Sequence, residues 1–227
     1  MIVPKMTKQE VNREIIRVLP SLMKFVLNKT KYREQKARKR GYPDEVSSYE
    51  IESLKFWVFY FKDNGADVNT IFCCYHDSIG VVYGLVNVYN PGQYSIVHFL
   101  KHAVDQYNSR LDLGLNQTKD ILFHMAKNAS TMVRKDLTTE DEDWLDVGYK
   151  CRNGLWIGES KSKILDSNTH VNIVRTFINN SLVRQDQEAV LDNDTLEKLI
   201  VFEQNIGGDA YARRRVSQLL GLFTLKN

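Results

Sequence analysis

The sequence is poor in the features that identify many common protein classes. It has only three cysteines, two of them adjacent at Cys73 and Cys74, and no Cys-x-x-Cys, zinc-finger, Walker or dinucleotide-binding glycine pattern. An odd cysteine count without an export signal indicates reduced thiols rather than a disulfide framework. The longest uninterrupted apolar stretch, Phe56 to Phe61, is too short to cross a bilayer, and the residues after Met1 lack the apolar middle of a signal peptide. We therefore expect a cytoplasmic or nuclear protein that is not secreted, with no membrane partner.

The overall composition is that of an ordinary globular protein. Of the 227 residues, 43% are hydrophobic and 26% are charged, which excludes a disordered or collagen-like chain. The length is sufficient to bury a core without disulfides or a structural metal. We expect a single domain over residues 1–227, in which residues 29–45 form either a basic helix or a basic arm or linker.

Positive charge is concentrated in one short segment. The protein has a formal net charge of +3, but residues 29–40 contain seven bases against one acid, Glu34: Lys29, Lys31, Arg33, Lys36, Arg38, Lys39 and Arg40. A second block, Asp136 to Asp146, holds six acids and no base. Such segregation indicates either a surface that faces a polyanion, with a separate acidic site, or two solvated stretches.

The basic segment predicts binding of DNA or RNA. Lysines and arginines that neutralise phosphates give strong salt dependence and little sequence preference. A membrane surface would require an apolar face alongside, which residues 29–40 do not offer. Arg213 and Arg214, in a run of three arginines, are additional candidates for contact with phosphate or with an acidic partner.

Hydrophobic spacing predicts a mostly helical α+β fold. Thr7 and Glu10 form a capping box, and an apolar stripe follows, interrupted by Pro20, where we expect a kink or two stacked helices. We expect a central buried helix from Ser47 through Phe61 and further helices at about 94–111, 117–132, 170–184, 194–206 and 209–222. Residues 68–90 fit either a buried helix or strands, so a small sheet including 80–89 is the alternative.

One β-hairpin, at about residues 145–164, is expected from local sequence. Asn153-Gly154 lies between two apolar runs, which is the strongest short-range signal for a two-residue hairpin turn. Pairing outward from that turn sets residue 148 opposite Glu159 and Asp146 opposite Lys161. Opposed residues share a face of the sheet, so the three charged residues are expected on one side.

An Asp, a short turn, an apolar strand and then Glu-x-Lys resemble the core of the PD-(D/E)XK nucleases. The resemblance covers about 20 residues, and Leu145 stands where the family usually has proline. It implies that Asp146 and Glu159 hold Mg²⁺ or Mn²⁺ and that Lys161 is catalytic, positioning or activating the attacking water. The resemblance therefore implies a metal-dependent nuclease that cleaves phosphodiester bonds.

Three alternatives stay open at this point. Asp146 opposite Lys161 also fits a plain cross-strand ion pair, and a helix running through Asp146 would remove the alignment. The second alternative is a non-catalytic nucleic-acid-packaging or assembly subunit, of viral coat or nucleoprotein type, for which we expect a homo-oligomer or a larger assembly. The third alternative is a helical metal site built on His98 and His102, although their helical spacing favours two solvated histidines.

Overall fold

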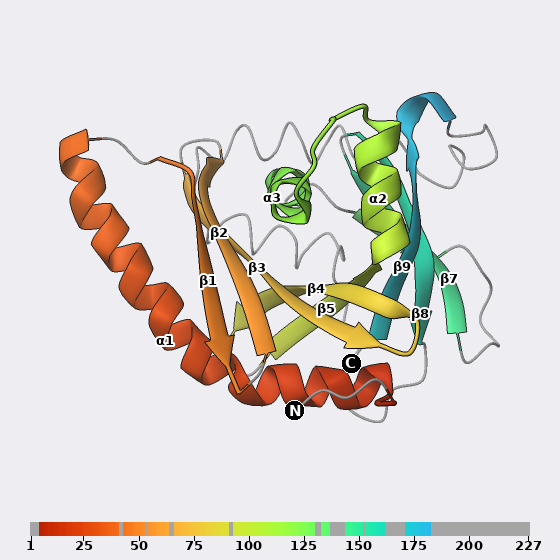
Figure 1. Ribbon diagram of the computed structural model, residues 1–227, viewed down its shortest axis with the longest axis horizontal. Helices are drawn as coiled ribbons and strands as arrows, with labels where there is room; N and C mark the ends of the chain where they lie inside the picture. Colours follow the sequence, from red (N-terminus) through yellow and green to blue (C-terminus); the bar gives the residue numbers. More distant parts are fainter. Residues whose placement is uncertain are drawn as a thin grey trace.

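The computed structural model describes residues 5–40, 43–52, 54–63, 66–90, 93–129, 133–136, 144–151, 153–161 and 171–182. These residues form one nine-stranded sheet and three α-helices (Figure 1). In chain order the elements are α1 (Lys8–Arg40), β1 (Glu45–Ile51), β2 (Leu54–Asp63), β3 (Ala66–Asp77), β4 (Gly80–Asn90), β5 (Gln93–Leu100), α2 (Lys101–Arg110), α3 (Thr118–Ala129), β6 (Val133–Asp136), β7 (Trp144–Cys151), β8 (Gly154–Lys161), β9 (Val171–Asn179) and a 3₁₀ turn, Asn180–Leu182.

The sheet consists of two antiparallel meanders joined side by side. Its strand order is β1-β2-β3-β4-β5-β9-β8-β7-β6, and the pairing of β5 with β9 is the parallel one among the described strands. Helix α1 covers one face, while α2 and α3 cover the other (Figure 1). Each face therefore has its own hydrophobic core, and the central strands are buried on both sides.

The prediction of a predominantly helical protein is wrong, and β2 shows why. Phe56, Val58 and Tyr60 pack toward α1, whereas Phe59 and Phe61 belong to the core under α2 and α3. A strand buried on both faces is apolar at nearly every position, so it shows no polar alternation and fits a helical pattern equally well. The helix expected from Ser47 to Phe61 is instead β1 and β2.

Two other expected helices are corrected in the same way. Residues 94–111 divide into β5 and α2, and residues 170–184 contain β9 rather than a helix. The ambiguous stretch 68–90 is strand, in β3 and β4, whereas α3 confirms the helix expected at 117–132. The helices expected at 194–206 and 209–222 lie outside the described residues.

Helix α1 begins and packs as its sequence predicts. The Thr7 backbone N–H donates to Glu10 Oε2 at 2.7 Å, and the Glu10 N–H donates to Thr7 Oγ1 at 3.3 Å, which closes the capping box. The apolar stripe is fully buried against the sheet: Val11, Ile15, Leu19, Leu22 and Val26. Figure 1 shows that the helix changes direction along its length. Pro20, which lies inside it, removes one helical hydrogen bond and explains the bend.

Strands β7 and β8 form the expected hairpin in a register shifted by two residues. Cys151 pairs with Gly154, so Glu159 lies opposite Asp146, and Lys161 lies opposite Trp144. A shift of two preserves which positions share a face of the sheet. It also replaces the expected pairing of Glu159 with residue 148 by a direct pairing of the two acidic positions.

Two glycines of β8 allow β9 to approach closely. A Cβ on Gly154 would lie 2.1 Å from the Ile178 carbonyl oxygen, and a Cβ on Gly158 would lie 2.0 Å from that of Ile173. Both contacts are with backbone atoms, which cannot rotate away. The pairing of β8 with β9, including the register shift between Ile157 and Gly158, therefore requires glycine at these two positions.

Candidate functional site

The hairpin places the two proposed metal-binding acids at neighbouring backbone positions. Asp146 and Glu159 are direct cross-strand partners. The Glu159 carboxylate forms an ion pair with the guanidinium of Arg175 on β9. The side chain of Glu159 is 18% exposed, and that of Arg175 is 61% exposed. The side chains of Asp146 and Lys161 lie outside the described part of the chain.

The chemistry around Glu159 is therefore that of a cross-strand ion pair. Among the residues that the structure describes, no group of three His, Cys, Asp or Glu side chains is placed to hold a metal ion. The sequence gives no signal that Arg175 pairs with Glu159, because residues 170–184 fit a helical pattern and the strand β9 brings the two residues together. A cation at Glu159 would have to compete with this guanidinium.

The basic segment occupies the second half of α1, in its helical form. Arg33 is only 4% exposed, and its guanidinium forms an ion pair with Glu45 and donates a hydrogen bond to the Pro43 carbonyl. Lys29 Nζ lies 2.5 Å from the other carboxylate oxygen of Glu45. Burial alone would raise the pKa of Glu45, but the hydrogen bonds from Lys29 and Arg33 lower it. These two bases thus hold α1 against the start of β1.

Other basic side chains of α1 point outward. Lys24 and Lys31 are exposed, and each is followed by an exposed aromatic residue: Phe25 is 51% exposed and Tyr32 is 57% exposed. Seven residues are nearly two helical turns, so Lys24 and Lys31 lie in one line along the helix, opposite the buried stripe. Phe25 and Tyr32 form a second line, about 100° around the helix from the line of lysines. We call Lys24, Phe25, Lys31 and Tyr32 the basic-aromatic face.

The remaining predicted contacts divide into two groups. The ammonium group of Lys36 lies over the Tyr32 ring of the basic-aromatic face, 6.0 Å from the ring centre. Arg38, Lys39 and Arg40 belong to the last turns of α1, although their side chains are not described. Arg213 and Arg214 lie outside the described residues.

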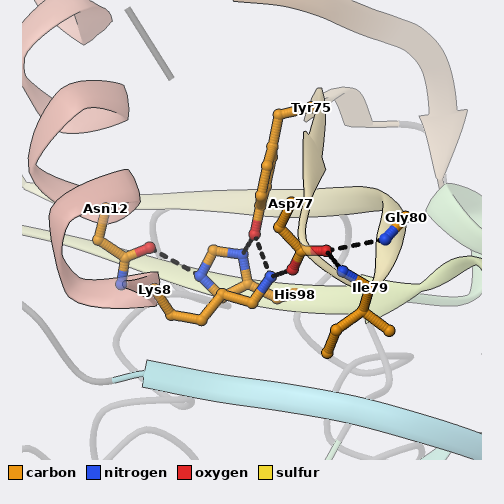
Figure 2. Close-up of polar contacts among 7 residues, drawn as sticks. All are labelled: Lys8, Asn12, Tyr75, Asp77, Ile79, Gly80 and His98. Carbon is orange, nitrogen blue, oxygen red and sulfur yellow. Dashed lines mark hydrogen bonds and ion pairs between the residues drawn. The ribbon is translucent and has the colours of Figure 1, made fainter. Parts of the chain in front are cut away.

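A buried polar network connects the first turns of α1 to the sheet (Figure 2). His98 on β5 is fully buried; its Nε2 lies 2.7 Å from Asn12 Oδ1, and its Nδ1 lies 2.7 Å from the Tyr75 hydroxyl. Lys8 Nζ donates to that hydroxyl at 3.0 Å and forms an ion pair with Asp77. Asp77 also accepts hydrogen bonds from the backbone N–H groups of two residues in the β3–β4 turn, Ile79 and Gly80.

The directions of these hydrogen bonds follow from their chemistry. The amide oxygen of Asn12 can only accept, so Nε2 of His98 carries the proton. In a neutral ring Nδ1 is then an acceptor, and the Tyr75 hydroxyl donates to it. The same hydroxyl oxygen accepts from Lys8. Every link is satisfied with the imidazole neutral, whereas a second proton, on Nδ1, would remove the acceptor of the Tyr75 O–H.

Burial perturbs the pKa of each titratable group in the network. Desolvation, followed by the nearby charge of Lys8, lowers the pKa of His98 to about 3. Desolvation also lowers the pKa of Lys8, although the hydrogen bond and the charge of Asp77 oppose this effect. Burial alone would raise the pKa of Asp77, but the hydrogen bonds from Lys8 and the β3–β4 turn lower it. A neutral, fully buried imidazole cannot reach an external substrate, so the network positions α1 rather than acting as a catalytic site.

The histidine interpretation from the sequence is corrected by this network. Because residues 94–111 were expected to form a helix, His98 was assigned with His102 to a polar, solvated face. In the structure His98 lies inside on β5, while His102 lies on α2 and contacts Gln106 at 2.8 Å. Gly84 stands opposite His98 on β4, and a Cβ there would lie 3.7 Å from Nδ1.

The cavity between the sheet and the two helices α2 and α3 is too small for a substrate. Its volume is about 10 Å³, and aromatic and aliphatic side chains with one polar residue, Asn128, line it. That volume accommodates about one water molecule. No helix of the described residues is long and apolar enough to cross a membrane.

Comparison of the chain with protein families, with curated proteins and with solved structures found no match.

Proposed function

We propose that the protein binds nucleic acid through the basic-aromatic face of α1. The observation that carries this proposal is the charge of the helix. It contains eleven basic and three acidic residues, a net charge of +8, in a protein of net charge +3, so the rest of the chain sums to −5. After Pro20, α1 has eight bases and a single acid, Glu34. A dense positive helix on an otherwise acidic body is the electrostatic footprint of a phosphate-binding element.

The arrangement of exposed apolar residues favours nucleic acid over a membrane surface. A helix that lies in a membrane interface needs one continuous apolar face. The apolar stripe of α1 is already buried against the sheet. Of the three exposed large hydrophobic residues of α1, Phe25 and Leu27 project about 200° apart around the helix and cannot enter a membrane together. Tyr32, on the flank of Phe25, carries a polar hydroxyl.

A reducing location is part of the same proposal. The three cysteines, Cys73, Cys74 and Cys151, are all free thiols. Free thiols without a disulfide are typical of the cytoplasm or nucleus, where nucleic acid is also found.

The test of this proposal is a fluorescence-anisotropy titration of labelled oligonucleotides at several salt concentrations. Changing Lys24 and Lys31 together to alanine should weaken binding and reduce the log–log salt slope by roughly 1.4 to 1.8, because two phosphate contacts are lost. The control changes Lys101 and Lys119, exposed bases on α2 and α3, and removes the same total charge. Equal slopes in the two double variants would refute an interface on α1.

A nuclease is the second candidate, and one observation favours it. The backbone register sets Asp146 directly opposite Glu159, closer than the pairing expected from the sequence. Two carboxylates on adjacent strands are suited to Mg²⁺ or Mn²⁺, and Lys161 follows two positions later in the same strand. The non-catalytic packaging or assembly role requires none of these groups.

Metal binding separates the two candidates. For a nuclease, Mn²⁺ should raise the melting temperature of the wild type, and Glu159→Gln should abolish that shift. Glu50→Gln, which removes an exposed carboxylate on β1, is the control and should retain it. Identical responses of the wild type and Glu159→Gln would leave the ion pair with Arg175 as the role of Glu159.

A further inference from the structure

The basic-aromatic face repeats the same pair of residues at a seven-residue interval. Lys24 precedes Phe25, and Lys31 precedes Tyr32, each lysine outermost and each aromatic on the same flank of the helix. Both aromatics are more than half exposed, at 51% and 57%. A single exposed aromatic residue is normal on a protein surface, but two in register with two bases indicate a repeated contact.

The surroundings of the two aromatic residues indicate the chemistry of that contact. The ring of Phe25 stacks against Tyr49 of β1 at 5.6 Å between centroids and 29° between planes, which fixes its orientation. The Lys36 ammonium lies over one face of the Tyr32 ring, 6.0 Å from the ring centre, which leaves the other face for a ligand. Rings held in this way beside cations present flat surfaces on which unpaired bases stack while the lysines contact the phosphates.

Duplex and single strand differ in their ability to use these rings. In a duplex the faces of the bases are covered by their neighbours, so a helix surface meets only phosphates, sugars and groove edges. In a single strand the bases are available for stacking on aromatic side chains. Two aromatics therefore add affinity for a single strand alone, whereas the lysines serve both forms.

We infer that the ligand of α1 is single-stranded nucleic acid, with bases stacked on Phe25 and Tyr32 and phosphates contacted by Lys24 and Lys31. This inference rests on the proposed function and specifies its ligand class. A seven-residue interval corresponds to a rise of about 10.5 Å along the helix. A single strand of a few nucleotides spans that distance, so one strand can contact both repeats.

The experiment compares a labelled dT₂₀ strand with the dT₂₀·dA₂₀ duplex, by anisotropy, over a series of salt concentrations. The wild type should bind the single strand more tightly. Tyr32→Ala should weaken single-strand binding about fivefold or more, change duplex binding less than twofold, and leave the salt slope unaltered, since no charge is removed. Adding Phe25→Ala to Tyr32→Ala should weaken single-strand binding further and leave duplex binding unchanged.

Leu27→Ala is the matched control. Leu27 is 54% exposed and aliphatic, and it lies on the other flank of the same helix, so its removal should leave both affinities unchanged. Because Phe25 packs on Tyr49, its variant is checked by circular dichroism and melting temperature. Tyr32→Ala alone decides the question if the double variant unfolds.

The possible failures are distinguishable. Equal affinity for single strand and duplex, with no effect of Tyr32→Ala, would overturn the single-strand inference and leave nucleic-acid binding by the lysines intact. Absence of binding to both would overturn the proposed function and the inference together. Binding to phosphatidylserine vesicles that is weakened by Leu27→Ala and Phe25→Ala alike, without binding to oligonucleotides, would identify a membrane ligand instead.

Discussion

Acidification should destabilise the protein through His98. In the folded state burial lowers the pKa of this imidazole to about 3, from an ordinary value of 6.5. The unfolded chain therefore binds a proton first as the pH falls. Stability rises with pH wherever the unfolded state holds more protons, so the contribution of His98 is fully present above pH 6.5 and is lost progressively between pH 6.5 and pH 3.

The size of the effect follows from the width of this interval. Each pH unit within it changes the free energy of unfolding by about 1.4 kcal/mol, so lowering the pH from 7 to 5 should remove about 2 kcal/mol. This is a large share of the ~5–15 kcal/mol that stabilises a typical domain. The pKa of Asp77 is lowered below its usual value of 3.8, so its own loss of stability comes at more acidic pH. Burial of His124 lowers its pKa as well and acts in the same direction as His98.

The assay is urea denaturation at pH 7 and at pH 5, with free energies obtained by linear extrapolation. His98→Gln replaces the imidazole with a neutral group, so the difference between the two pH values should shrink by about 2 kcal/mol, leaving the part due to His124. At pH 7 the same variant should be less stable by roughly 1–3 kcal/mol, because Asn12 or Tyr75 loses its partner. The control, His102→Gln, removes an exposed imidazole on α2 and should preserve the wild-type difference. If His98→Gln loses as much stability at pH 5 as the wild type does, the imidazole is not held neutral by burial.

Two further predictions concern packing and the anchoring of α1. Gly158→Ala should lower the free energy of unfolding, measured by urea denaturation, by about 3 kcal/mol or more, because its Cβ would lie 2.0 Å from a backbone carbonyl oxygen of β9. Gly84→Ala is the control and should lower it less, because the nearest neighbour of its Cβ is a side-chain methyl group at 3.2 Å. Arg33→Ala should lower the free energy of unfolding by roughly 1–3 kcal/mol, because Glu45 loses a buried partner. Arg17→Ala, which removes an exposed ion pair, should lower it by less than about 1 kcal/mol. Similar values for the two variants would contradict an anchoring role of Arg33.

Local sequence signals predicted the elements that are decided by local interactions. The capping box at Thr7 and Glu10 and the stripe that follows it lie within α1, and the hairpin of β7 and β8 depends on a turn of a few residues. The register was predicted wrongly: the sequence pairs residue 148 with Glu159 and Asp146 with Lys161, whereas the structure pairs Asp146 with Glu159. The reason is that the strands first pair at Cys151 and Gly154 rather than at residues 152 and 155.

What could not be predicted depends on contacts between distant segments. The apolar run of β2 has no periodicity of its own, because α1 buries one face of it and α3 the other. In residues 94–111, the spacing of Ile96, Leu100, Ala103 and Tyr107 fits a continuous helix, and no glycine or proline marks the change from β5 to α2. Nor does any local signal connect His98 with Asn12, which is 86 residues earlier in the chain.

The contacts of α1 explain why its basic residues divide into two kinds. The buried network fixes its first turns through Lys8 and Asn12, and the pairs of Lys29 and Arg33 with Glu45 fix its second half beyond the bend at Pro20. With both halves anchored, the rotation of the helix about its axis is set. The bases that point inward stabilise the fold, and the line of Lys24 and Lys31 is held toward solvent on a rigid element. The backbone positions of these two lysines are therefore fixed, although their side chains keep their own rotational freedom.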